Sequence, residues 1–392
     1  MAEPDRKGLL VVGSGPGGVS AADAFRRHDR DAPVRILTAD SERPYARPPL
    51  SKDYLRGDTD DVFLHPADWY DQRAIELHLA TEVDAIDPTA HTVTVGSDVY
   101  GYDALVLACG AAPKPLSVPG GDLALPLRSL ADAARLCRYV DDAASAVIIG
   151  AGFIGCEVAA SLALRGLDVT VVAPGDVPQL ERLGRAAGER VRRMVTDAGA
   201  RYLGGVSVRA VEPGVVHLDD GTGLSCDLVV AATGVTPRVR LAADAGLDVR
   251  DGRVVVGADM RTSHRDVYAV GDVALAFNAT AGRHIAVEHW QDADDHGAVA
   301  GASAAGSAAE WQAVPGFWSS IGEATLKQHA WGDGYQRDRL IDHGDGFTVW
   351  YESAGATVGV LTCNADEDYD DGADRVAGGL PPPTLPSSAE LD

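Results

Sequence analysis

Cysteine, lysine and long apolar runs are all scarce in this chain of 392 residues. Its five cysteines stand singly, with no C-x-x-C or C-x₄-C pair, which favours a reducing compartment over a disulfide framework. No run of about 18 consecutive apolar residues is present, so we expect no membrane span. Charged residues among the first positions are unlike the apolar core of a signal peptide. We therefore expect a cytoplasmic protein without membrane contact.

Basic residues are outnumbered by acidic ones, 34 against 58, and the formal net charge is −24. Because a nucleic-acid binder must neutralise phosphates with Lys and Arg, we expect no nucleic-acid partner. The H-E-x-x-H, C-x₂-C and G-x₄-G-K-[ST] patterns are absent, and we expect no metal site and no P-loop. A hydrophobic content of 46% is ordinary for a globular protein, and the length suggests two or three domains.

A β-α-β pattern occurs twice along the chain. The apolar run at 8–12 leads into the glycine turn at 13–18, and the run at 146–149 leads into a second glycine turn at 150–155. Each turn opens an alanine-rich helical stretch, and further apolar runs follow at residues 34–37 and 169–172. The repeat predicts an α/β protein with two Rossmann-like, doubly wound units. Alternating residues beyond about position 315 predict antiparallel strands at the C-terminal end.

The first turn has the spacing of a dinucleotide-binding site. Gly13 permits the tight turn, Gly15 lets a pyrophosphate approach the backbone, and Gly18 lets helix and strand pack closely. The N-terminus of the following helix then offers free N–H groups to the phosphates. Asp40 lies about 20 residues further on, where an acid binds the adenosine ribose. A tight turn without ligand is the alternative interpretation.

The second turn repeats this spacing with Gly150, Gly152 and Gly155. The apolar run that follows ends at Ala173-Pro174, without a carboxylate, and no arginine follows until Arg182. The usual acid for NADH and the usual arginine for NADPH are thus both missing. We favour NADH, because a phosphate needs a cation more than a diol needs an acid.

The segment Arg43–Asp53, reading R-P-Y-A-R-P-P-L-S-K-D, resembles a signature of the FAD-dependent ferredoxin reductases that serve oxygenases and cytochromes P450. These are relatives of putidaredoxin reductase, rubredoxin reductase and apoptosis-inducing factor, within the pyridine nucleotide-disulfide oxidoreductase superfamily. Supporting similarities occur at residues 107–110, 232–234, 268–272 and 288–290. The resemblance spans about residues 8–365.

The resemblance implies a glutathione reductase-like architecture of three domains. A discontinuous FAD domain would comprise residues 5–112 and 240–313, with an NAD(P)H domain at 113–239 inserted into it. An α+β domain with an antiparallel sheet would follow at 314–377, and we expect residues 378–392 to form a disordered tail. The protein would be a monomer or a homodimer.

The resemblance also implies roles for individual residues. Lys52 and Glu157 would be catalytic, paired near the flavin N5, where a positive charge stabilises reduced flavin; an exposed surface lysine is the alternative for Lys52. Asp272 would hold the FAD ribityl chain. Trp290 and Trp318 would stack on the flavin or pack in the core. The remaining implied cofactor contacts, beyond the glycines of the two turns and Asp40, are Pro16, Arg47, Val83, Cys109, Gly110, Arg128, Phe153, Ile154, Gly234, Gly271, Glu288 and His289.

This chain departs from the family pattern at two places. Relatives usually have the ribose acid one position before Asp40, where this chain has Ala39, and they commonly read W-S-D where this chain has Trp318-Ser319-Ser320. The cysteine pair of the disulfide reductases is also missing. We interpret Cys109 and Cys156 as packing residues. Electrons must therefore leave the flavin without a thiol relay.

Three functions are compatible with these features. The first is electron transfer from NAD(P)H through FAD to a [2Fe–2S] ferredoxin; the others are an NAD(P)H oxidase or quinone reductase, and a redox-sensing flavoprotein similar to apoptosis-inducing factor. An acidic ferredoxin would need a local basic face on this acidic chain. Scattered solubilising charge is the alternative interpretation of the basic candidates, which are Arg182, Arg185, Arg190, Arg192, Arg193, Lys327, Arg337 and Arg339.

Overall fold

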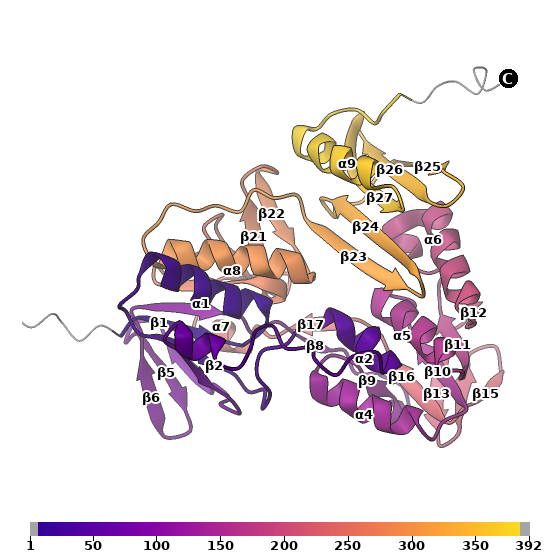
Figure 1. Cartoon of the computed structure of the whole chain (residues 1–392), viewed down its shortest axis with the longest axis horizontal. Coiled ribbons are helices and arrows are strands. Elements are labelled where there is room, and N and C mark those ends of the chain that lie inside the picture. Colours follow the sequence, from indigo (N-terminus) through magenta and orange to yellow (C-terminus); the bar gives the residue numbers. More distant parts are fainter. Residues whose placement is uncertain (1–6, 385–392) are drawn as a thin grey trace, which may run out of the picture.

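The computed structural model describes residues 7–384 and divides them among three lobes (Figure 1). The first lobe is built on a parallel sheet in the order β20-β7-β1-β2-β3. Its central strand β1 (Leu9–Val12) is buried at every position, as a strand covered on both faces must be. Helix α1 (Pro16–His28) follows the first glycine turn. The other strands are β2 (Val34–Leu37), β3 (Ile75–His78), β7 (Ala104–Leu107) and β20 (Val267–Ala269).

The second lobe repeats this arrangement around β10 (Ser145–Ile149), in a parallel sheet ordered β12-β11-β10-β16-β9. Its glycine turn opens α5 (Phe153–Leu164), and α6 (Leu180–Asp197) leads from β11 to β12. The two sheets confirm the predicted pair of β-α-β units. Remaining elements of this lobe are β9 (Leu125–Pro126), α4 (Leu130–Val140), β11 (Asp168–Ala173), β12 (Arg201–Gly204) and β16 (Leu228–Ala231), with the small sheet of β13 (Val208–Glu212), β14 (Val215–Leu218) and β15 (Gly223–Ser225).

The chain crosses between these lobes on two strands that pair with each other, β8 (Ala111–Pro113) and β17 (Val235–Pro237). The first lobe therefore contains residues from both sides of the second. Its smaller elements are the sheet of β4 (Ala85–Asp87), β5 (Thr92–Val95) and β6 (Asp98–Gly101), the sheet of β18 (Val249–Arg250), β19 (Arg253–Val256), β21 (Ala274–Asn278) and β22 (Arg283–Ala286), and the short helices η1 (Pro48–Ser51), α2 (Asp53–Arg56), α3 (Trp69–Gln72), α7 (Arg240–Asp244) and η3 (Gly271–Val273).

The C-terminal lobe is an antiparallel sheet in the order β23-β24-β27-β26-β25, covered by α9 (Asp366–Gly378). Its strands, which confirm the predicted antiparallel class, are β23 (Gly316–Ile321), β24 (Ala324–Ala330), β25 (Arg337–Asp342), β26 (Phe347–Ser353) and β27 (Ala356–Cys363). The lobe lies over α5 and α6 in Figure 1. Its apolar side chains share one core with both helices, so the second and C-terminal lobes pack as a unit.

The expected disordered tail needs correction over residues 378–384. The Leu380 carbonyl accepts a hydrogen bond from the Thr357 backbone N–H, and the Pro383 carbonyl accepts one from Arg339. These bonds hold the segment against the sheet. Residues 385–392 lie outside the described part of the chain. Within residues 7–384, no helix is both long and apolar enough to cross a membrane.

Helix α8 (Trp290–Ala304) packs against α1 with almost no space between the two backbones, and the two run side by side in Figure 1. A Cβ atom built on Gly297 would lie 2.2 Å from the Gly17 carbonyl oxygen, and one on Gly301 would lie 2.2 Å from that of Ala21. Glycine at these positions lets α8 place its N-terminus beside the first glycine turn.

We predict that Gly297→Ala destabilises the fold by about 1–3 kcal/mol, because the added methyl group forces the two helices apart. Gly223→Ala is the matched control, since its Cβ would meet no atom closer than 3.5 Å. Thermal unfolding followed by tryptophan fluorescence measures both. Equal melting temperatures for the two variants would show that the helix contact tolerates a methyl group.

Candidate functional site

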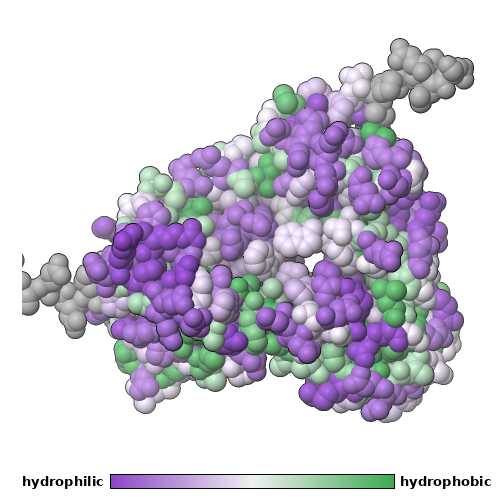
Figure 2. All heavy atoms as spheres, in the orientation of Figure 1, coloured by the Kyte–Doolittle hydropathy of each residue, from purple (hydrophilic) through white to green (hydrophobic). Residues whose placement is uncertain are grey.

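A cavity of about 460 Å³ lies where the three lobes meet. The face shown in Figure 2 is mostly hydrophilic and is hollowed near its centre, between the lobes. The lining combines both glycine turns, the 47–52 segment, the start of α8 and strand β23. The predicted site residues among the lining are Gly15, Pro16, Arg47, Lys52, Gly110, Arg128, Gly152, Phe153, Ile154, Gly155, Glu157, Gly234, Gly271, Asp272, Glu288, His289, Trp290 and Trp318.

The first glycine turn opens the N-terminus of α1 towards this cavity. Gly13 has φ +108°, and a Cβ on Gly18 would lie 2.1 Å from the Gly13 carbonyl oxygen, so both glycines are required by the packing of strand and helix. At Gly15 the nearest atom to a Cβ is an Arg47 nitrogen at 3.4 Å. Gly15 thus faces the cavity, which leaves its backbone open to a phosphate.

The second turn has the same geometry. Gly150 has φ +108°, and a Cβ on Gly155 would lie 2.1 Å from the Gly150 carbonyl oxygen. No atom lies within 4 Å of a Cβ built on Gly152. Two helix N-termini therefore face one cavity. This arrangement can hold two dinucleotides with their reactive ends together.

Two arginines from different parts of the chain line the cavity with unsatisfied donors. Arg128 pairs with Asp272, which is buried at the start of η3. The Nε atoms of Arg47 and Arg128 are buried without a hydrogen-bond partner among the described residues. Burial lowers the pKa of the Arg47 guanidinium. A buried donor without an acceptor is costly, so the free Nε groups of these two arginines suit a bound diphosphate, and the predicted cofactor fits the residues present.

Asp40 does not line the cavity. Its carboxylate accepts a hydrogen bond from the Tyr45 hydroxyl at 2.8 Å and another from the Glu42 backbone N–H. Val83 is buried in the core of the first lobe, and Cys109, Gly13, Gly18 and Gly150 also lie outside the lining. The predicted ribose role of Asp40 stays a prediction.

The structure brings Lys52 and Glu157 together in a buried ion pair. Lys52 Nζ lies 2.7 Å from Glu157 Oε2, and the two residues are 8% and 5% exposed. This burial overturns the alternative of an exposed surface lysine. The Ser51 hydroxyl donates to Glu157 Oε2 at 2.5 Å, and the Ser161 hydroxyl donates to the Ser51 carbonyl at 2.8 Å. Helix α5 therefore fixes the 48–52 segment against the second glycine turn.

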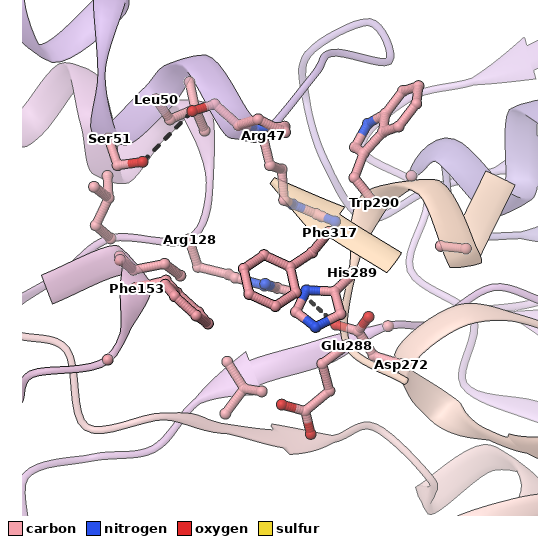
Figure 3. Close-up of a pocket in the computed structure, with 18 of the residues that line it drawn as sticks. Arg47, Leu50, Ser51, Arg128, Phe153, Asp272, Glu288, His289, Trp290 and Phe317 are labelled. Atoms are coloured by element: carbon pink, nitrogen blue, oxygen red, sulfur yellow. Dashed lines mark hydrogen bonds and ion pairs between the residues drawn. The ribbon is translucent and has the colours of Figure 1, made fainter. Parts of the chain in front are cut away.

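Aromatic rings from all three lobes meet at the cavity wall. Phe317 of β23 stacks on His289 with ring centroids 4.7 Å apart and contacts Phe153 at 4.4 Å (Figure 3). Arg182 lies over the Phe317 ring and hydrogen-bonds the His289 Nε2 atom. Burial, with the nearby Arg182 charge, lowers the pKa of His289 to about 3. His289 is therefore neutral at physiological pH.

The two predicted tryptophans lie at the edge of the cavity. Trp290 and Trp318 meet edge to face with centroids 6.3 Å apart, and Trp318 is 43% exposed. This exposure excludes core packing as the role of Trp318. The Trp290 indole nitrogen is buried without a partner among the described residues, which leaves a donor for a ligand.

No cysteine is among the lining residues. Cys156 is fully buried, and burial raises the pKa of its thiol to about 12; the Cys109 thiol is raised to about 11 for the same reason. Protonated thiols are poor nucleophiles. Packing roles for both residues agree with this environment.

Several lining residues escaped the sequence prediction. Ser51 lies inside the Arg43–Asp53 signature and could have been chosen from it. Arg182, Gln179 and Phe317 line the cavity only because α6 and β23 fold back over the second glycine turn. Ser319, whose hydroxyl binds Glu157, belongs to the segment that departs from the family pattern.

A sequence profile described as pyridine nucleotide-disulphide oxidoreductase matches residues 7–297. The chain belongs to this family. The ferredoxin–NAD(+) reductase component of the anthranilate 1,2-dioxygenase system of Burkholderia cepacia is 35% identical over 328 residues, 81% of this chain and 80% of that protein. The putidaredoxin reductase of Pseudomonas putida is 31% identical over 95% of this chain and 92% of its own.

Solved structures agree with this membership. The covalent putidaredoxin reductase–putidaredoxin complex matches with a TM-score of 0.90 and 29% identity, over 97% of this chain and 94% of that chain. The ferredoxin reductase for the CYP199A2 system from Rhodopseudomonas palustris matches with a TM-score of 0.91 and 29% identity, over 96% of both. The chain is a flavoprotein oxidoreductase of the ferredoxin–NAD(P)+ reductase type, from a family that contains FAD. The predicted fold class and enzyme class are confirmed.

Asp292 is a buried carboxyl group whose pKa is shifted by burial and by nearby charges. Asp292, near the start of α8, is 1% exposed, and its Oδ2 atom has no hydrogen-bond partner among the described residues. Burial, then the Asp295 charge, raises its pKa to about 8, although Arg182 and the Gly316 backbone N–H oppose the shift. A raised pKa contributes stability that is complete below the unfolded value and is lost as pH rises towards the folded value.

We predict that Asp292→Asn stabilises the protein by about 1–3 kcal/mol at pH 7.5 and by much less at pH 4.5, because asparagine cannot ionise. Urea unfolding at both pH values measures the difference. Glu310→Gln, on the exposed loop after α8, is the control. A stability difference independent of pH would contradict the assignment.

Proposed function

We propose that the chain oxidises NADH through bound FAD and passes electrons singly to a [2Fe–2S] ferredoxin that serves an oxygenase or a cytochrome P450. The proposal rests on one observation: two glycine turns and a buried Lys52–Glu157 pair share a cavity whose lining has no cysteine. The names of the relatives support it, since they include a ferredoxin–NAD(+) reductase of a dioxygenase system and a putidaredoxin reductase. Five free cysteines fit a reducing compartment, and we propose a cytoplasmic location.

The residues at the first turn would hold the FAD. The α1 N-terminus at Gly15–Pro16 and the unsatisfied Nε atoms of Arg47 and Arg128 would neutralise the pyrophosphate. Asp272, fixed by Arg128, would accept hydrogen bonds from the ribityl hydroxyls. Bound FAD would supply the conversion between a two-electron hydride donor and a one-electron acceptor.

Lys52 would act as a fixed positive charge on the cavity wall. Because Lys52 is buried and held by Glu157, its position is set before any ligand binds. A preorganised cation stabilises negative charge more effectively in a water-poor site than in solvent. This is the role that we propose for Lys52. We propose that Glu157 lies beside the nicotinamide end of the bound NADH.

The preference for NADH is supported by the loop after β11. Asp176 lies three residues beyond the strand and binds Arg185 at 2.8 Å. In doubly wound folds, residues at the end of this strand bind the adenosine ribose. A carboxylate there can accept ribose hydroxyls, and its pairing with Arg185 leaves no net positive charge at this site to attract a 2′-phosphate.

Electrons would leave by the face that carries Trp318. The indole is exposed at the cavity edge, on the edge strand β23. Half of the eight candidate basic residues are paired with carboxylates, which weakens the basic docking face considered from the sequence; these are Arg185, Arg190, Arg192 and Lys327. We therefore propose that apolar contact around Trp318, more than charge, holds the ferredoxin.

We predict that the purified protein is yellow and that NADH reduces its flavin anaerobically much faster than NADPH does. Adding a [2Fe–2S] ferredoxin should then stimulate NADH-dependent cytochrome c reduction strongly. A tenfold faster turnover with quinone or oxygen, on the order of 1.4 kcal/mol of barrier, would favour the oxidase alternative. Slow turnover with a persistent long-wavelength band would favour the redox sensor.

We predict a second property of the reaction with an acidic ferredoxin. Raising the salt concentration should leave kcat/KM unchanged or increase it, because this chain carries a net charge of −24 and salt screens its repulsion of an acidic partner. Steady-state rates between about 0.01 M and about 0.15 M salt test this, since the Debye length falls from about 30 Å to about 8 Å. A steep fall in kcat/KM would indicate a basic docking face and overturn the apolar docking proposal.

A further inference from the structure

The Glu157 carboxylate is hydrogen-bonded by residues from two other lobes. Its Oε2 atom pairs with the Lys52 ammonium and accepts a hydrogen bond from the Ser51 hydroxyl, both of the first lobe. Its Oε1 atom accepts a hydrogen bond of 2.7 Å from the hydroxyl of Ser319, which belongs to β23 of the C-terminal lobe. Among residues 7–384, no other hydrogen-bond donor to Oε1 is present. The orientation of this carboxylate about its long axis therefore depends on Ser319.

The strand geometry of β23 explains why this serine reaches the pair. Side chains alternate between the faces of a strand, and Phe317, Ser319 and Ile321 are buried while Trp318 is exposed. Phe317 contacts Phe153 and Ser319 contacts Glu157, so the buried face of β23 covers α5. Ser320 points away from this face, and its hydroxyl pairs with Thr325 at 2.9 Å.

The hydrogen bond from Ser319 also offsets part of the free-energy cost of burying the two charges. A carboxylate removed from water needs hydrogen bonds to both oxygens, because an oxygen without a donor raises the free-energy cost of burying the ion pair. A hydrogen bond to a charged group is worth about 1.5–3 kcal/mol. Without Ser319, Glu157 can turn its free Oε1 towards Lys52 or the cavity, and Lys52 loses its single fixed position.

We propose that Ser319 is a positioning residue for hydride transfer, acting through Glu157 to hold Lys52 in place. The proposal rests on the proposed function, since it assumes that the nicotinamide and the flavin meet beside this pair. It assigns a role to the segment where this chain reads Trp318-Ser319-Ser320. It also links the strand that carries the exposed Trp318 to the Lys52–Glu157 pair, beside which the flavin would accept the hydride.

A double-mutant cycle tests the proposal. Stopped-flow reduction of the FAD-loaded protein by NADH is measured for wild type, Ser319→Ala, Glu157→Gln and the double variant. We expect Ser319→Ala to slow flavin reduction about tenfold, as the loss of a charge-assisted hydrogen bond implies, with little change in the NADH concentration for half-maximal rate. In the Glu157→Gln background, Ser319→Ala should have no further effect, because it acts through Glu157.

Ser320→Ala is the matched control and should reduce at the wild-type rate. FAD content, the flavin absorption spectrum and the thermal midpoint of each variant report on folding independently of activity. If Ser319→Ala does not retain FAD, the cycle is repeated with Ser319→Cys, which keeps the volume and weakens the donor.

Two outcomes would overturn the inference: an unchanged rate in Ser319→Ala, or equal slowing in both Glu157 backgrounds, which would show a merely structural role for the serine. Failure of wild type to bind FAD or to oxidise NADH would instead contradict the proposed function.

Discussion

The Lys52–Glu157 ion pair is the interaction on which the arrangement of the cavity depends. Removing two charges from water costs several kcal/mol per ion unless hydrogen bonds replace the lost solvation. Here both carboxylate oxygens are satisfied, by groups from the first and the C-terminal lobes, while Glu157 itself belongs to the second. A pair that is costly to bury and is held by all three lobes keeps the two glycine turns at a fixed separation.

The same arrangement explains how the cavity can hold two dinucleotides and still be open at one edge. The glycine turns direct helix N-termini into it from opposite lobes, and the aromatic contact of Phe153, Phe317 and His289 closes one wall. Trp318 stands at the edge, partly exposed. Since no cysteine lines the cavity, an electron pathway through its edge is consistent with the chemistry of the wall.

Much of the fold could be predicted from local patterns. Glycine turns, apolar strands and alternating strands depend on neighbouring residues, and the structure places each where the spacing indicates. Long-range pairings could not be predicted from local patterns, and the Lys52–Glu157 pair was expected only from the family resemblance. Arg190 of α6 binds Asp342 at the end of β25, and residues 378–384 are held by β25 and β27. Ser319 reaches Glu157 across 162 positions of sequence, and nothing local to either residue indicates the contact.

A structure of the protein with FAD and NAD+ bound tests the central claim most directly. The quantity to measure is the distance from Lys52 Nζ to the flavin N5 atom. Our account predicts hydrogen-bond distance, about 3 Å, with the nicotinamide ring against Phe153 and the Lys52–Glu157 pair intact. A flavin bound with its N5 far from Lys52, or a nicotinamide held outside this cavity, would contradict it.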